Sequence, residues 1–312
     1  ELCFILFCLF TLTIIYAGVR NGIERVSKFM MPILIVLSVL IAVYSVTRPG
    51  AMEGVKYFLV PNVKNFSWMT VVAAMGQMFY SLSIAMGILI TFGSYMKKET
   101  SLEDSTRNVE VFDTAIAIMA GLMIIPAVFS FSGGDPDTLQ AGPALMFITI
   151  PKVFENMGFG TVVGILFFLL VLFAAVTSSI ALTESAVSTF EDELGWSRRR
   201  ATVLVGVIMI ALGSLSSLGY GPLVGIKIIG MQFLDFFDFL TNSVMMPIAA
   251  MLTSLFVSRI VGMKRMEEEI MHGESTFRRK KIFIVMIKYL CPVFALIILI
   301  SSVANAFGWI AM

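Results

Sequence analysis

Residues 76–87 read Gly-Gln-Met-Phe-Tyr-Ser-Leu-Ser-Ile-Ala-Met-Gly, in the middle of an apolar segment that runs from about residue 69 to residue 95. A continuous helix over this segment would be roughly 40 Å long at about 1.5 Å per residue, whereas the hydrocarbon core of a bilayer is about 30 Å thick. Polar groups at its midpoint need hydrogen-bond partners, because an unpaired polar group in lipid is strongly unfavourable. The extra length and the polar centre predict a helix that is interrupted in mid-membrane.

An interruption at this place would free backbone carbonyl and amide groups near Ser81 and Ser83. Together with the two hydroxyls, these groups could line a site for an ion and a small polar substrate. The alternative is a continuous helix whose serine hydroxyls bond back to carbonyls in the preceding turn, which is common in membrane helices. The residues of this stretch leave both interpretations open.

The whole chain has the composition of a membrane protein. Of its 312 residues, 58% are hydrophobic and 14% are charged, and the mean hydropathy is +0.93. Repeated long apolar runs in such a chain are typical of transmembrane helices. We therefore predict an all-α polytopic membrane protein, with a single transmembrane domain over residues 1–312 and eight spans at about 1–17, 29–47, 69–95, 112–131, 159–190, 201–217, 232–258 and 283–305.

The charged residues and cysteines narrow the function further. Most of the 22 Lys and Arg residues fall in one set of loops and helix ends, which the positive-inside rule assigns to the cytoplasm. The net charge of +1 gives no indication of nucleic-acid binding. The three cysteines lie in predicted spans without metal-ligand spacing, so we expect packing roles and no transition metal. Because the chain begins with Glu1 and not Met, we expect it to be part of a longer protein.

A second polar group lies in the predicted span at 159–190. Thr177 and Ser178 follow Ala174 by about one helical turn. The two hydroxyls and the carbonyl of Ala174 offer oxygen ligands that suit a hard cation such as Na⁺. The alternative is small-residue helix packing, with the hydroxyls bonded between helices.

Among the acidic residues within predicted spans are Asp113 and Glu184. An ionisable residue inside the membrane is by default a functional candidate. Asp113 could instead be a helix N-cap at the start of its span. Glu184 could be a partner in a structural network, a proton-linked group or part of a water path, and we favour the structural role.

Five different motifs follow one another along the chain. Residues 18–32 read Gly-Val-Arg-Asn-Gly-Ile-Glu-Arg-Val-Ser-Lys-Phe-Met-Met-Pro, and the mid-membrane stretch opens with Gly-Gln-Met-Phe-Tyr-Ser-Leu-Ser. The other three are Ala141-Gly142-Pro143 with Ile150-Pro151, the run Ala-Ala-Val-Thr-Ser-Ser at 174–179, and Phe-Glu-Asp-Glu-Leu at 190–194. In this order and spacing they resemble the neurotransmitter:sodium symporter family. The resemblance implies a five-plus-five inverted-repeat fold, of which this chain would contain helices 4 to 11, with a discontinuous sixth helix at about 69–95.

The resemblance also implies a set of functional residues. The sodium-binding residues would be Ser81, Asp113, Ala174, Thr177 and Ser178. The substrate-binding residues would be Tyr80, Ser83, Met86, Ser179 and Leu182. The gates would be Gln77, Asp238, Tyr95 and Asp192, and the hinges would be Gly22, Pro32 and Gly87. Asp235 lies one turn before Asp238, so the sequence leaves open which of these two acids pairs; Gly22 and Pro32 could also be a loop glycine and a helix-start proline.

Two positions depart from the pattern of the family. Met86 stands where many members have a large aromatic residue, and its flexible side chain would favour large apolar or aromatic amino acids, unless it only packs in lipid or in a core. Asp113 stands where many members have an asparagine, and Ala117 where chloride-dependent members usually have a hydroxyl. A carboxylate beside Ser81 could replace a bound chloride, so we expect transport that is independent of chloride.

The resemblance thus implies sodium-coupled symport of amino acids by alternating access. Na⁺ would be the co-transported ion, with no organic cofactor and no enzymatic activity. The partners would be the amino acid, the lipid bilayer and helices 1 to 3 of the same protein, and the location a plasma membrane, a prokaryotic inner membrane in particular. The alternatives are a proton-coupled amino-acid permease, or a non-transporting fragment or scaffold.

Overall fold

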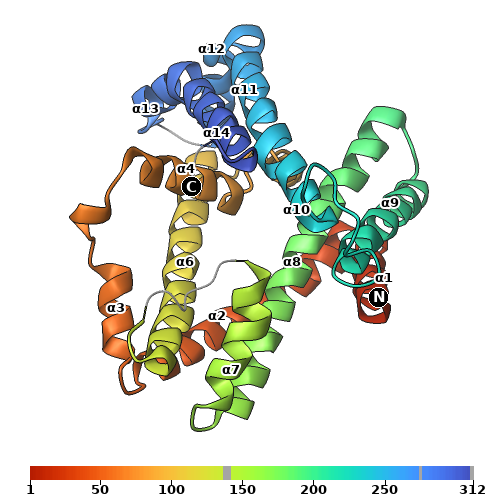
Figure 1. Cartoon of the computed structure of the whole chain (residues 1–312). Helices are drawn as coiled ribbons and strands as arrows, with labels where there is room; N and C mark the ends of the chain where they lie inside the picture. Colours follow the sequence, from red (N-terminus) through yellow and green to blue (C-terminus); the bar gives the residue numbers. More distant parts are fainter. Residues whose placement is uncertain (136–141, 274–275, 310–312) are drawn as a thin grey trace. The chain divides into compact units, whose positions relative to one another are not determined.

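The computed structural model describes residues 1–135, 142–273 and 276–309, and every regular element in these ranges is a helix (Figure 1). Ala141 of the Ala-Gly-Pro motif lies outside the described residues. A membrane helix needs about 20 predominantly apolar residues. The segments long and apolar enough to cross a membrane are Val19–Val46, Leu102–Ser132, Gly160–Leu194, Arg198–Gly219, Phe233–Val261 and Lys280–Ala306, and Leu2–Tyr16 is a shorter apolar helix. The expected all-α membrane fold is confirmed.

The α-helices are bounded as follows: α1 (Leu2–Tyr16), α2 (Arg25–Val46), α3 (Ala51–Leu59), α4 (Trp68–Ser81), α5 (Ile88–Ser94), α6 (Leu102–Ser132), α7 (Ile150–Glu155), α8 (Gly160–Leu194), α9 (Arg198–Gly219), α10 (Phe233–Asp238), α11 (Met246–Phe256), α12 (Met263–Ile270), α13 (Lys280–Val285) and α14 (Cys291–Ala306). Several spans also contain π-helical segments, in which hydrogen bonds reach one residue further than in an α-helix. These are η1 (Val19–Glu24), η4 (Leu145–Thr149), η5 (Phe239–Met245), η6 (Val257–Val261) and η8 (Met286–Leu290).

The chain divides into two compact units. The first unit comprises Glu1–Gly18, Ser67–Glu110 and Ile180–Met312, and the second unit comprises Val19–Phe66 and Val111–Ser179. Both α6 and α8 begin in one unit and end in the other.

The core of the second unit lies where α2, α6, α7 and α8 pack together. Ile41, Val128, Val153 and Phe167 are among its buried residues. The rings of Phe154 and Phe167 meet edge to face with centroids 5.4 Å apart, a favourable aromatic geometry. These contacts join the described parts of the second unit through close side-chain packing.

The core of the first unit contains side chains from α4, α11 and α14, such as Phe79, Ala250 and Ala295. Within this unit α11 and α14 pack side by side (Figure 1). The hydroxyl of Ser254 in α11 donates a hydrogen bond to the carbonyl of Ile287, which lies in η8. A π-helical turn displaces carbonyls from their usual helical partners, and buried carbonyls need a donor. Ser254 supplies that donor to the neighbouring helix.

The long segment that holds residues 76–87 is broken, as predicted. α4 ends at Ser81 and α5 begins at Ile88. Between them Ser83, Ala85 and Gly87 have φ values of 53°, 64° and 79°. A left-handed residue costs about 1–2 kcal/mol for any amino acid except glycine, and a right-handed helix cannot pass through it. The interrupted helix is therefore confirmed, and the alternative of a continuous helix with back-bonded serines is wrong.

Two further alternatives are wrong because helices begin earlier than the hydropathy pattern suggests. α6 begins at Leu102, so Asp113 lies inside the helix and is not an N-cap. Gly22 lies in the π-helical segment that leads into α2, and Pro32 lies inside α2, so they are not a loop glycine and a helix-start proline. In both cases a polar helical overhang precedes the apolar part, and hydropathy detects only the part that lies in lipid.

Candidate functional site

The C-terminal end of the broken segment, at Met86 and Gly87, is held against α8. The hydroxyl of Ser185 lies 3.5 Å from the carbonyl of Met86, to which it donates. A Cβ atom added to Gly87 would lie only 2.6 Å from the same hydroxyl oxygen, and the φ of Gly87 is +79°. Both the contact and the left-handed backbone therefore favour glycine at this position.

We expect Gly87→Ala to lower the melting temperature of the purified protein in detergent by a few degrees, because a left-handed alanine costs about 1–2 kcal/mol and its methyl group meets Ser185. Gly93→Ala is the matched control, since Gly93 lies in α5 with nothing within 4 Å of the added Cβ. The double variant Gly87→Ala/Ser185→Ala should recover only the part of the loss that comes from the contact. Equal melting temperatures for the two glycine variants would contradict this assignment.

A second hydroxyl contact joins α5 to α8. Thr91 Oγ1 and Ser188 Oγ are both buried and lie 3.2 Å apart. The Ser188 hydroxyl also lies 3.1 Å from the carbonyl of Ser185, to which it can donate. Buried hydroxyls that have no water nearby need hydrogen-bond partners within the protein. The pair of Thr91 and Ser188 meets this need and fixes α5 on this face of α8.

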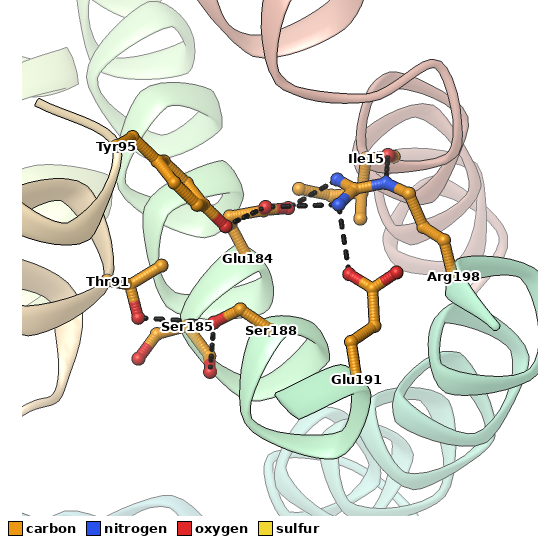
Figure 2. A network of polar contacts seen from close by, with 8 residues as sticks. All are labelled: Ile15, Thr91, Tyr95, Glu184, Ser185, Ser188, Glu191 and Arg198. Carbon is orange, nitrogen blue, oxygen red and sulfur yellow. Dashed lines mark hydrogen bonds and ion pairs between the residues drawn. The ribbon is translucent and has the colours of Figure 1, made fainter. Parts of the chain in front are cut away.

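Glu184 lies at the centre of a polar network in the first unit (Figure 2). Its side chain is fully buried. The hydroxyl of Tyr95 donates to Glu184 Oε1 over 2.7 Å. The guanidinium of Arg198, the first residue of α9, reaches both carboxylate oxygens, with Nη2 2.5 Å from Oε2 and Nη1 3.2 Å from Oε1. A buried carboxylate is tolerated when it is paired and hydrogen-bonded in this way.

Arg198 extends the network to two more groups. Its Nη1 lies 3.2 Å from Glu191 Oε2, and its Nε donates to the carbonyl of Ile15 over 2.8 Å. Ile15 lies in the last turn of α1, and its carbonyl also accepts a hydrogen bond from the backbone N–H of Gly18 over 3.0 Å. The network thus ties α1, α8, α9 and the residue after α5 together (Figure 2). We call Tyr95, Glu184, Glu191 and Arg198 the Glu184 network.

The network confirms that Glu184 has structural partners. The sequence did not predict that Arg198 is one of them. Arg198 stands first in the run Arg198-Arg199-Arg200, which the positive-inside rule treats as a cytoplasmic group. The signal that points to it is Glu184 itself, because a buried acid in a membrane helix requires a cationic partner. The expected gate residue Tyr95 is bonded to Glu184, while Asp192 is exposed.

In the second unit the structure brings together two of the expected sodium ligands. The hydroxyl of Thr177 lies 3.0 Å from the carbonyl of Ala174 and 3.1 Å from that of Phe173. A hydroxyl that donates its proton to a carbonyl keeps lone pairs that can accept a cation. Thr177 and Ala174 therefore offer two oxygen atoms on one side of α8, and Ser178 next to them is exposed.

Expected substrate residues of the first unit lie at the break, beside the expected sodium ligand Ser81. Tyr80 and Ser81 occupy the last turn of α4 and are exposed, and Ser83 lies in the unwound part. Met86 packs against the core that contains Phe79, so part of its side chain serves ordinary packing. In the same unit Leu182 is exposed in α8, while Ser179 belongs to the second unit.

The expected outer gate residues lie on two elements of the first unit. Gln77 in α4 and Asp238 at the end of α10 are both exposed. The amide of Asn242 donates to Asp238 Oδ1 one helical turn further on. Of the two acids in this helix, Asp238 is therefore the one with a described hydrogen bond, and this bond orients its carboxylate.

Known proteins resemble this chain over most of its length. The sequence profile of the Sodium:neurotransmitter symporter family matches residues 1–308. The uncharacterized sodium-dependent transporter YhdH of Bacillus subtilis is 35% identical over 87% of this chain and 59% of its own length. An uncharacterized sodium-dependent transporter of Haemophilus influenzae is 32% identical over 96% of this chain and 64% of its own length. The chain thus spans less than two thirds of the length of these relatives.

A solved structure shows the same fold. The crystal structure of MhsT in complex with L-phenylalanine matches 95% of this chain and 66% of its own chain, with a TM-score of 0.82 and 36% sequence identity. This match confirms the expected inverted-repeat transporter fold. The profile match, the relatives and the shared fold agree, and the chain belongs to the sodium:neurotransmitter symporter family.

Proposed function

We propose that the protein is a sodium-coupled symporter of amino acids that works by alternating access. The observation that carries this proposal is the break between α4 and α5, where the backbone of residues 82–87 leaves the helix within an apolar segment. Non-helical backbone at membrane depth is tolerated where it lines a cavity or is covered by protein, and transporters place substrate and ion sites at such breaks. The family supports the same function.

The ion ligands in this proposal are Ser81, Asp113, Ala174, Thr177 and Ser178. The short distance between Thr177 Oγ1 and the carbonyl of Ala174 supports a pair of ligands for one cation. Carbonyl and hydroxyl oxygens suit Na⁺, a hard cation. Substrate would contact Tyr80, Ser83, Met86, Ser179 and Leu182.

The gates and hinges complete the proposed cycle. Gln77 and Asp238 would act as gates with Tyr95 and Asp192, and Gly22, Pro32 and Gly87 would act as hinges. The left-handed backbone of Gly87 supports a hinge at the break. The position of Gly22 in a π-helical segment supports one before α2, because π-helical turns often mark functional positions.

The geometry favours sodium over protons as the coupling ion. Glu184, a candidate for a proton-linked group, is bonded to both Arg198 and Tyr95. Because this carboxylate is already hydrogen-bonded to a guanidinium and a phenol, its contacts support a structural role rather than proton transport. We place the protein in a plasma membrane as a multi-pass protein, with large apolar or aromatic amino acids as substrates.

Uptake measurements test this proposal. The full-length protein is reconstituted in proteoliposomes, and uptake of labelled tryptophan, leucine and glycine is measured with inward Na⁺ or K⁺ gradients, in chloride or gluconate. We expect uptake of tryptophan and leucine that requires Na⁺ and is unchanged by gluconate, because Asp113 supplies the negative charge. Uptake that ignores Na⁺ but follows pH would overturn the sodium assignments, and a need for chloride would overturn the role of Asp113.

A further inference from the structure

The last membrane helix begins inside a run of basic residues. Residues 278–281 read Arg-Arg-Lys-Lys, and the span Lys280–Ala306 starts within this run. α13, η8 and α14 follow one another without a gap and form this span (Figure 1). Four cationic side chains therefore stand at a helix end that the positive-inside rule assigns to the cytoplasm.

Two of these four charges are already compensated within the first unit. Arg279 Nη1 lies 2.8 Å from Glu110 Oε2, and Lys280 forms an ion pair with Glu267. The hydrogen bond to Glu110 and its negative charge raise the pKa of Arg279 above its usual value, so Arg279 stays charged. Within the described part of the chain, the salt bridges of this run reach only Arg279 and Lys280. Arg278 and Lys281 are exposed, and neither side chain is in a described salt bridge, although the backbone N–H of Arg278 donates to Glu103 Oε2 over 3.1 Å and Arg278 lines a cavity with Glu103 and Asp104.

An apolar stripe follows Arg278 and Lys281 along the helix in the C-terminal direction. Ile282, Val285, Tyr289 and Val293 are 66%, 47%, 64% and 51% exposed. Their spacing of three or four residues places them on one side of the helix. The stripe is long enough to follow an acyl chain from the membrane surface into the hydrocarbon region.

We propose that this end of the helix binds an anionic phospholipid, with Arg278 and Lys281 on the phosphate headgroup and one acyl chain along Ile282, Val285 and Tyr289. Guanidinium and ammonium groups form strong charge-assisted hydrogen bonds with phosphate. Basic residues next to a membrane helix on its cytoplasmic side attract anionic lipids. Arg279 and Lys280 are already paired with acidic residues. Arg278 and Lys281, which flank them in the sequence, therefore remain to bind one headgroup.

Charge complementarity together with the apolar stripe favours a lipid over a soluble phosphate compound. A soluble phosphate would use only Arg278 and Lys281, whereas a phospholipid also covers Ile282 and Val285. The interaction depends on the protein lying in a membrane and not on the transported substrate or ion. A negative result here would therefore leave the proposed transport function untouched.

Native mass spectrometry of the full-length protein in a nonionic detergent tests the proposal. Phosphatidylglycerol and phosphatidylcholine are added in parallel, and the bound lipid is counted. We expect preferential binding of phosphatidylglycerol, and about a 30-fold loss of its affinity in Arg278→Gln/Lys281→Gln, since each basic residue near the surface contributes about fivefold. Binding of phosphatidylcholine should not change.

Two control variants make the result specific. Arg199→Gln/Arg200→Gln removes two exposed cytoplasmic charges elsewhere and should keep the affinity for phosphatidylglycerol. Arg278→Lys/Lys281→Arg keeps both charges and should keep most of the affinity. An equal loss in the Arg199 and Arg200 variant would overturn the site, because any surface charge would then suffice. Displacement of the bound lipid by an equal concentration of glycerophosphoglycerol, the headgroup without acyl chains, would overturn the role of the apolar stripe.

Discussion

Replacing Arg198 by methionine should destabilise the protein by about 3–5 kcal/mol, the usual loss when one partner of a buried ion pair is removed. The variant leaves the carboxylate of Glu184, which is fully buried, without its cation. It also removes the side-chain donor to the carbonyl of Ile15, and with it the hydrogen bond that Arg198 makes from α9 to α1. The measurement is the free energy of unfolding, or the melting temperature, of the purified protein in detergent.

Arg199→Met is the matched control for this prediction. Arg199 is the next residue in the same helix, and it is exposed. Its replacement should change the stability by less than about 0.5 kcal/mol, as for most surface positions. The double variant Arg198→Met/Glu184→Gln should recover much of the loss, because the charge that lacks a partner is then removed as well. If Arg198→Met and Arg199→Met melt at the same temperature, the network does not stabilise the fold.

Replacing Thr177 by valine should raise the Na⁺ concentration needed for half-maximal uptake by roughly 10- to 150-fold. Valine has the shape of threonine but lacks the hydroxyl that lies 3.0 Å from the carbonyl of Ala174. A polar contact to a charged group contributes about 1.5–3 kcal/mol, and 1.4 kcal/mol corresponds to a factor of ten. The measurement is amino-acid uptake into proteoliposomes over a range of Na⁺ concentrations.

Thr189→Val is a close control for this substitution. Thr189 lies in the same helix, and its hydroxyl donates to the carbonyl of Ser185 over 2.8 Å, so the loss of a local hydrogen bond is the same. Thr177→Ser should restore most of the sodium affinity, because it keeps the hydroxyl. A similar rise in the required Na⁺ concentration in Thr189→Val would show that the effect comes from the helix and not from a bound ion.

The broken helix could be predicted because its signal is local. The length of the apolar segment and the polar residues between Gly76 and Gly87 are both visible in one stretch of sequence. The bond between Thr177 and Ala174 is similarly local, because it spans three residues of one helix. Features that lie within a few turns of one helix follow from spacing alone.

The Glu184 network could not be predicted, because it depends on how helices pack. Glu184 and Arg198 lie on different helices, and the turn between α8 and α9 decides whether they meet. Their neighbour Tyr95 comes from a segment almost ninety residues earlier. The helix start at Leu102 was also missed, because hydropathy marks where a helix enters lipid and not where it begins.

The bond from Ser254 to the carbonyl of Ile287 has a mechanical consequence for α11 and α14. A shift of one helix past the other by a single turn, about 5.4 Å, would break this hydrogen bond. The bond therefore opposes sliding of α11 along α14, but it does not oppose a common tilt of the two helices. We therefore expect α11 and α14 to move together as a rigid body during a conformational cycle.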